Sequence, residues 1–257
     1  MDHELWFTAL LNKAFAGVLT PLLAKLGMPP ANTAEAAHPI PNYIGMEILI
    51  ALLIIAIALV LRARLSVESP GKLQHLMEVV LQFTQNLADE IIGHGGRRYV
   101  PMLGTLGLFV AFCNLSSLIP NLAVPVPEFG IEVSPTGCIQ VTLGLAVVAF
   151  LYYNYHGIRQ HGVVGYLKHL CGPMMAIAII MFPIEVISNL GRMLSLSVRL
   201  YANMLVGGLL EQVFGGLVPL LVPVIFAALH AFVSFLQAYI FMLLPSIYLS
   251  MAVSEEH

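Results

Sequence analysis

Long apolar runs separated by short polar stretches dominate the chain. The run from Ile44 to Leu61 is apolar apart from Glu47, and residues 99–119 and 138–155 form two further runs of this kind. A helix rises about 1.5 Å per residue, so runs of about 18 to 21 residues approach the ~30 Å hydrocarbon core of a bilayer. The pattern therefore predicts three membrane-spanning helices, at 44–61, 99–119 and 138–155.

Two runs near the C-terminus are too long for a perpendicular crossing. Residues 174–214 end before a glycine pair that favours a helix stop, and residues 217–253 contain no Asp, Glu, Lys or Arg. As a helix, the last run would measure roughly 55 Å, against a core of ~30 Å. We therefore predict an antiparallel hairpin of two helices whose tilt is well beyond the ~20° average of membrane helices.

The remaining segments are less apolar. Residues 71–92 are amphipathic, so we expect a helix that lies along the membrane interface or packs on other helices, with a polar face that is either solvated or in contact with a partner. Residues 1–43 combine a short amphipathic helix from Leu5 to Leu26 with a proline-rich stretch, and we expect them to lie on one membrane face. Three glycines, at 157, 162 and 165, are expected to break the helix after residue 155 and to place His156 in a loop.

The distribution of positive charge predicts the topology. From Arg62 onward, the basic residues outside the predicted spans all fall on one side: Arg62, Arg64, Lys72, Arg97, Arg98, Arg159 and Lys168. By the positive-inside rule this side is cytoplasmic. Residues 1–43 are then an external segment, residues 44–257 are one membrane domain with about five crossings, and the C-terminus is cytoplasmic.

The composition agrees with this pattern. The chain is 59% hydrophobic and 10% charged, whereas soluble domains carry about 25% charged residues. The predicted fold class is an all-α polytopic membrane protein with an interfacial amphipathic helix and the tilted hairpin. The net charge of −3 indicates no nucleic-acid partner, and three scattered cysteines indicate neither a disulfide framework nor a zinc site, so no cofactor is expected.

Polar residues form one edge of the helix predicted at 174–214. At about 100° per residue these side chains fall within one stripe: Glu185, Ser188, Asn189, Arg192, Ser195, Arg199 and Asn203. Arginine at a helix centre costs roughly +2.5 to +3.5 kcal/mol on translocon scales, so two arginines need a reason. Arg192 lies two turns from Glu185, which leaves open a pair with that carboxylate or a position at the membrane edge. Arg199 has no charged neighbour on its own helix, so its partner is expected elsewhere.

The last helix carries three polar residues on one face. His230, Ser234 and Gln237 stand at positions i, i+4 and i+7. The Ser234 hydroxyl is expected to bond back to its own helix, and Gln237 either links helices or serves a function. His230 can take and release a proton near neutral pH, because the ordinary pKa of histidine is about 6.5.

These features together resemble the a subunit of the rotary F-type ATP synthase of bacteria. The resemblance extends from about Ile44 onward and rests on SLSVRLYANM at 195–204, NLSSLIP at 114–120, PTGCIQVTL at 135–143 and the ending IYLSMAVSEEH. It implies a proton-translocating stator subunit in which two offset half-channels protonate and deprotonate the carboxylates of a rotating c ring. It also implies partners, namely the c-subunit ring, the peripheral-stalk b subunits and the rest of the complex, in the bacterial plasma (inner) membrane. The subunit would not be an enzyme by itself.

The resemblance also implies residue roles. Arg199 matches the essential arginine that faces the c-ring carboxylate. Asn203, His230 and Gln237 match residues of the external half-channel. Ser195 and Glu185 match positions toward the cytoplasmic exit, where Arg192 replaces a common lysine and is interpreted as positional.

The chain departs from the family pattern at four positions. Gly208 stands where many members have a glutamate, while Ser117, Cys138 and Gln140 replace frequent acidic or amide residues. We hypothesise that Glu211, about one turn from Gly208, supplies the carboxylate, so that the proton inlet uses Glu211 and His230 with water.

Two alternatives to this function remain open. One is a stand-alone secondary transporter in which Arg199 binds an anionic substrate, although no inverted repeat supports it. The other is a sodium-driven version of the same subunit.

Overall fold

The computed structural model describes residues 6–25, 38–66, 69–93, 95–118, 134–171, 178–217 and 221–253. Every regular element in these residues is helical, so the prediction of an all-α membrane protein is confirmed. The elements are α1 (Trp6–Lys25), α3 (Asn42–Ala63), α4 (Lys72–Ile91), the 3-10 helix η1 (Gly96–Tyr99), α5 (Val100–Ser116), the 3-10 helix η2 (Pro135–Gly137), α7 (Ile139–Cys171), α8 (Ala178–Leu217) and α9 (Leu221–Val253).

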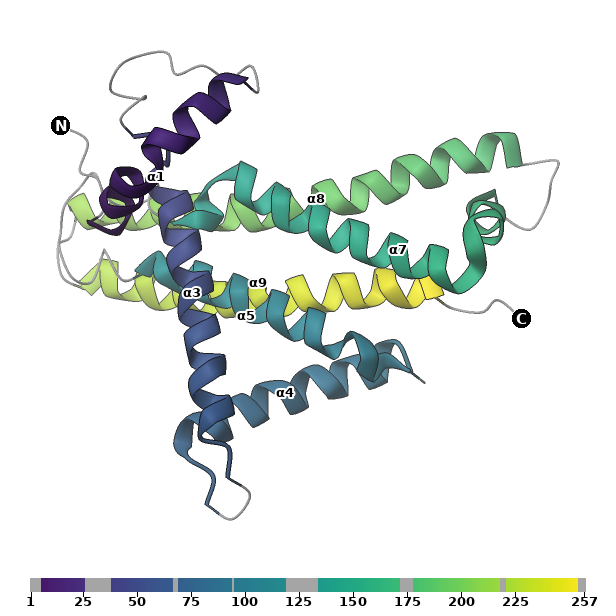
Figure 1. The fold of residues 1–257 in the computed structure, drawn as a ribbon, viewed down its shortest axis with the longest axis horizontal. Helices are drawn as coiled ribbons and strands as arrows, with labels where there is room; N and C mark the ends of the chain where they lie inside the picture. Colours follow the sequence, from purple (N-terminus) through teal and green to yellow (C-terminus); the bar gives the residue numbers. More distant parts are fainter. Residues whose placement is uncertain are drawn as a thin grey trace.

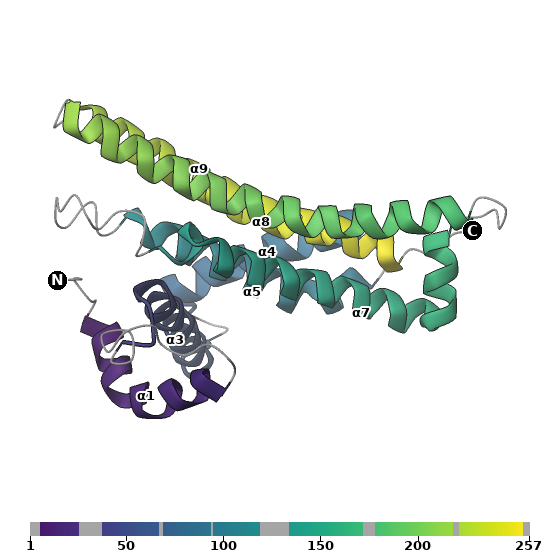
Figure 2. The ribbon, with the colours of Figure 1, turned by 90° about the horizontal axis from the view of Figure 1, so that it is seen from above.

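Helix α3 runs across the long axes of α8 and α9 (Figures 1 and 2). Its 22 residues measure roughly 33 Å, which matches the thickness of the hydrocarbon core. By contrast, α8 has 40 residues and α9 has 33, or roughly 60 and 50 Å. When α3 crosses the membrane near its normal, the antiparallel α8–α9 pair therefore lies at a steep angle to that normal, as the mismatch in length predicts.

Helix α1 packs on the N-terminal end of α3. The side-chain amide of Asn12 donates to the carbonyl oxygen of Ile40 (3.0 Å), and its oxygen accepts from the Ile40 amide (2.9 Å), so one side chain pairs with both backbone groups. Six helices in the described part are long and apolar enough to cross a membrane, and α1 is one of them. The placement of residues 1–43 on a membrane face therefore stays a prediction.

Helix α7 differs from the sequence prediction. It was expected to end near residue 155, with His156 in a loop, but it continues to Cys171 with a kink at Gly162, where φ is +71°. A backbone with this positive φ is open to glycine without strain, so the predicted break falls at Gly162, where two helical stretches meet at a kink, and not directly after residue 155. The expectation for His156 was wrong because its ring packs within the helical bundle, 4.9 Å from the centroid of the Tyr99 ring.

The core lies where α5, α7, α8 and α9 meet. Two clusters of buried apolar residues fill this region, one around Tyr99, Leu103 and Leu249 and the other around Val110, Leu200 and Phe241. The amphipathic α4 packs against α5 and α9, and the Ser250 hydroxyl of α9 donates to the carbonyl oxygen of Ile91 (2.8 Å). The amphipathic helix therefore packs on other helices, which is one of its two predicted placements.

Candidate functional site

The polar edge of α8 is divided by its packing against neighbouring helices. Asn189 is buried, while Ser195 and Arg199 on the other border of the stripe are exposed. Glu185 and Arg192, between these borders, are half-buried. The stripe predicted from the sequence therefore has one border inside the bundle and the other on its surface.

Arg199 lies on an exposed apolar flank of α8. Side chains on this flank include Val198, Val206 and Leu209, each about half exposed. Within the part of the chain that the structure describes, Arg199 forms no hydrogen bond or ion pair. Because an arginine at membrane depth requires an anionic partner or water, this arrangement leaves its charge available to something outside the described residues.

Arg192 has a partner on its own helix. Its Nη2 atom lies 3.3 Å from Oε1 of Glu185, and its guanidinium carbon lies 5.5 Å from the centroid of the Tyr248 ring of α9. Of the two alternatives for Arg192, the pair with the Glu185 carboxylate is therefore the one that forms. The two arginines of α8 have different surroundings.

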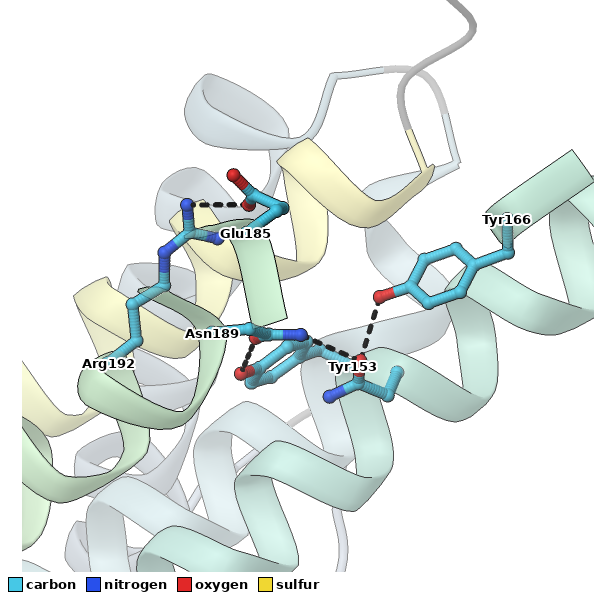
Figure 3. Close-up of polar contacts among 6 residues, drawn as sticks. Tyr153, Tyr166, Glu185, Asn189 and Arg192 are labelled. Atoms are coloured by element: carbon cyan, nitrogen blue, oxygen red, sulfur yellow. Dashed lines mark hydrogen bonds and ion pairs between the residues drawn. The ribbon is translucent and has the colours of Figure 1, made fainter. Parts of the chain in front are cut away.

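A network of hydrogen bonds ties this end of α8 to α7 (Figure 3). The Tyr153 hydroxyl donates to Oδ1 of Asn189 (2.5 Å), and Nδ2 of Asn189 donates to Oδ1 of Asn154 (3.1 Å). The Tyr166 hydroxyl donates to the same Asn154 oxygen (2.7 Å). Sequence reasoning missed Tyr153, Asn154 and Tyr166. The available signal was the polar pattern YYNYH at 152–156 within a helix that begins as an apolar span.

The polar face of α9 points into the bundle. His230, Ser234 and Gln237 are all buried, with exposed fractions of 5%, 2% and 5%. The His230 ring lies against Gly207 of α8, where a Cβ atom would come within 2.9 Å of Nε2. Glycine at 207 therefore allows the imidazole to approach the backbone of α8.

Ser234 does not make the bond that the sequence predicts. Its hydroxyl is buried and has no hydrogen-bond partner among the described residues, so the expected bond to its own helix was wrong. Ser246, about three turns further along α9, makes such a bond instead, to the carbonyl oxygen of Met242 (2.7 Å). The backbone carbonyl of Ser234 accepts a bond from Nδ2 of Asn114 on α5 (3.2 Å).

A polar site therefore exists between α5 and α9. Oδ1 of Asn114 is also buried without a partner among the described residues, like the Ser234 hydroxyl. Buried polar atoms in proteins are nearly always hydrogen-bonded, to protein or to ordered water. The Asn114 Oδ1 atom and the Ser234 hydroxyl, on the two residues joined by the bond between α5 and α9, are therefore suited to bind water. Sequence reasoning had noted Asn114 only as part of a motif.

The other predicted positions are distributed along the same end of the hairpin. Asn203 of α8 is half-buried, as is Gly208. Glu211 belongs to α8, but its side chain lies outside the described part of the structure. The structure therefore does not test whether Glu211 lies close to His230. Among the described residues, no group of three or more His, Cys, Asp or Glu side chains could hold a metal ion.

Comparison with known proteins decides the family. A sequence profile described as ATP synthase A chain matches residues 44–250. This chain belongs to the ATP synthase A chain family. The resemblance drawn from the sequence is thereby confirmed, and the family match begins at the first span, so residues 1–43 lie outside it.

Individual relatives cover the chain more completely. ATP synthase subunit a of Koribacter versatilis is 42% identical over 257 residues, which is all of both chains. ATP synthase subunit a of Solibacter usitatus is 42% identical over 250 residues, covering 96% of this chain and all of the relative. ATP synthase subunit a 3 of Pelobacter propionicus is 39% identical over the full length of both chains.

Proposed function

We propose that this chain is the proton-translocating stator subunit of the membrane sector of an ATP synthase. The observation that carries the proposal is Arg199, a permanent charge on an exposed apolar flank of α8 without a partner among the described residues, in a chain of this family. A guanidinium does not release its proton near neutral pH, so it cannot relay protons. It attracts a carboxylate and favours the ionised form of that carboxylate.

The partner of Arg199 is a carboxylate on a rotating ring of c subunits. The steep α8 offers a long apolar flank for this contact, with side chains that are about half exposed in the isolated chain: Val198, Val206, Leu209 and Val213. The apolar flank of α8 lets each c-ring carboxylate move past it, and the carboxylate meets a positive charge only at Arg199. Proton loss is favoured at that point.

Two offset half-channels lead to this point. The external one uses Asn203, His230, Gln237 and Glu211, and the water site at Asn114 and Ser234 extends it toward α5. The cytoplasmic one uses Ser195 and Glu185, with Arg192 as the positional partner of that carboxylate. Arg199 lies between the two along α8, so its charge opposes direct proton passage from one half-channel to the other.

The energy for rotation comes from the membrane potential and the proton gradient. A charge that crosses the membrane potential gains about 2.3 kcal/mol per 100 mV, so one proton per c carboxylate supplies one ratchet step. The chain contributes no ATP chemistry of its own, and the catalytic step belongs to other subunits of the complex.

The side of the molecule formed by α3, α4 and α5 faces the peripheral-stalk b subunits. An apolar cavity of about 420 Å³ lies between these three helices, with Arg62 and Glu78 among its lining residues. The exposed polar face of α4 lies on the cytoplasmic side of the bacterial plasma membrane, together with the C-terminus. The N-terminus is external when α1 lies on the membrane face, and residue-specific labelling from each side of sealed vesicles tests that placement.

The central test replaces Arg199 with alanine. In inverted membrane vesicles that contain the whole complex, Arg199→Ala is expected to abolish ATP-driven proton pumping, and retained pumping would overturn the proposal. Co-purification with a c ring distinguishes a synthase subunit from a stand-alone transporter. A requirement for sodium during pumping would identify a sodium-driven subunit.

A further inference from the structure

Tyr153 of α7 contacts both other helices of the hairpin region. Its hydroxyl donates to Oδ1 of Asn189 on α8 (2.5 Å), and its ring packs on the Tyr248 ring of α9, with centroids 5.8 Å apart. Only 4% of Tyr153 is exposed. A buried tyrosine whose hydroxyl is bonded has little freedom to rotate, so it fixes the distance between the helices that it touches.

Tyr248 connects Tyr153 with the ion pair. The Arg192 guanidinium carbon lies 5.5 Å from the Tyr248 ring centroid, and its Nη2 atom lies 3.3 Å from Oε1 of Glu185. Asn189, the other contact of Tyr153, lies one helical turn from Glu185. Tyr153 therefore supports the Glu185–Arg192 pair in two ways. Its bond to Asn189 holds α8 one turn from Glu185, and its ring packs on the Tyr248 ring that the Arg192 guanidinium contacts.

Asn154 completes the cluster in a way that excludes proton conduction. Its Nδ2 atom donates to the carbonyl oxygen of Phe150 (2.7 Å), which leaves Oδ1 to accept from Asn189 and from Tyr166 (3.1 and 2.7 Å). Both donors point at one oxygen, so the bonds do not form a continuous donor-to-acceptor chain. The cluster holds side chains in place and does not pass protons.

The segment of α7 beyond its kink is tied to the same cluster. Tyr166 lies after Gly162 and returns to Asn154, twelve residues earlier. Gly157 leaves room for this return, because a Cβ atom there would come within 2.6 Å of Cε2 of Tyr166. The kink, the missing side chain at 157 and the tyrosine hydroxyl together place the end of α7 beside the N-terminal part of α8.

We propose that Tyr153, Asn154 and Asn189 are positioning residues of the cytoplasmic half-channel. They hold the Glu185 carboxylate and the Arg192 guanidinium in a fixed arrangement relative to α7 and α9. The inference rests on the proposed function, because it requires Glu185 to serve proton transfer on the cytoplasmic side.

The test is a double-mutant cycle in the whole complex, in inverted vesicles. Tyr153→Phe keeps the ring and removes only the hydroxyl, and it is expected to slow ATP-driven pumping about two- to tenfold, the value of one hydrogen bond. In a Glu185→Gln background the same substitution is expected to add no further loss, because the residue on which Tyr153 acts is already gone. Glu185→Asp is a second background that keeps a carboxylate, so that a pumping rate remains to be measured, and there the loss caused by Tyr153→Phe is expected to shrink.

A matched control separates positioning from general packing. The hydroxyls of Thr142 and Ser197 also join α7 and α8, with their oxygens 3.1 Å apart, but at a distance from Glu185 along the helix. Thr142→Val is expected to leave the pumping rate unchanged. Equal losses from Tyr153→Phe and Thr142→Val, or a full additional loss from Tyr153→Phe in both Glu185 backgrounds, would show that the cluster only stabilises the fold.

The outcome is also distinct from a failure of the proposed function. Pumping retained by Arg199→Ala contradicts the proposed function itself. An inactive Arg199→Ala together with a wild-type rate for Tyr153→Phe overturns only the positioning role. Asn189→Ala gives a second measure of that role, because it removes the acceptor of the Tyr153 hydroxyl and the donor to Asn154 at once.

Discussion

The guanidinium of Arg192 lies 3.3 Å from the carboxylate of Glu185, seven residues earlier on α8. This contact separates the two arginines of the helix. Arg192 is neutralised within its own chain and rests on an aromatic ring, whereas Arg199, two turns further along, has no partner among the described residues. A charge that is already paired serves to position a group, while an unpaired charge at membrane depth is suited to act on a partner.

Substitution of Arg199 by lysine tests whether charge alone is sufficient. Lysine keeps a positive charge, but its ammonium group is more strongly hydrated, lacks the planar set of donors and loses its proton more readily in apolar surroundings. We expect Arg199→Lys to lose most ATP-driven pumping in inverted vesicles. Arg192→Lys is the matched control and is expected to lose much less, because a single donor can maintain the pair with Glu185. Similar losses in both variants would contradict the distinction drawn between the two arginines.

Substitution of Gly207 by alanine tests the contact between α8 and His230. The added Cβ atom would lie 2.9 Å from Nε2 of His230, so the ring must move away from α8. Alanine is favoured over glycine inside a helix by about 1 kcal/mol, so a loss of pumping would come from the displaced ring and not from a weakened helix. We expect slower pumping in Gly207→Ala. Gly144→Ala on α7, where a Cβ atom meets nothing within 4 Å, should pump at the wild-type rate.

Substitution of Ser234 by alanine tests the polar site between α5 and α9. The Ser234 hydroxyl has no partner among the described residues to lose, so the temperature of thermal unfolding of the complex should change little. Pumping should nevertheless slow, because water bound at the proposed site would lose the Ser234 hydroxyl as a partner. Ser246→Ala removes a hydroxyl that bonds only to its own helix and serves as the control. A wild-type pumping rate for Ser234→Ala would remove this water site from the external half-channel.

Substitution of Glu211 by glutamine tests the proposed replacement for the carboxylate that Gly208 lacks. Glutamine has nearly the same shape but cannot take up a proton near neutral pH. We expect proton-driven ATP synthesis in membranes carrying Glu211→Gln to fall clearly below the wild-type rate. Glu90→Gln, on the exposed face of α4, provides a control for the loss of one negative charge. Unchanged synthesis in Glu211→Gln would exclude Glu211 from the proton path.

Much of the architecture was predictable because the signals are local. The apolar length of 44–61 identifies a span, and the surplus length of the last two runs indicates tilt without knowledge of any contact. Arg199 was conspicuous for the same reason, since a charge inside an apolar run is costly wherever it lies. The cluster around Asn154 was missed because its hydrogen bonds join residues twelve and thirty-five positions apart.

Two local expectations differ from the folded chain. The sequence suggested that glycines would end α7 and that Ser234 would bond to its own helix, which are the usual outcomes for an isolated helix. In the folded chain, the glycine break falls at Gly162, later than expected, and Tyr166 beyond it returns to Asn154, while the Ser234 hydroxyl is buried without a partner among the described residues.

The polar stripe of α8 separates what the sequence predicts from what the packing of the helices adds. Helical periodicity alone determined that Asn189, Arg192 and Arg199 share one side of the helix, because each residue advances by about 100°. It did not determine which of them is covered, since that depends on how much of the helix surface α7 and α9 occupy. These neighbours enclose the border at Asn189 and leave the border at Arg199 open. The sequence determined the charges and their direction, and only the packing of α7 and α9 against α8 decided which border of the stripe is covered and which is presented to a partner.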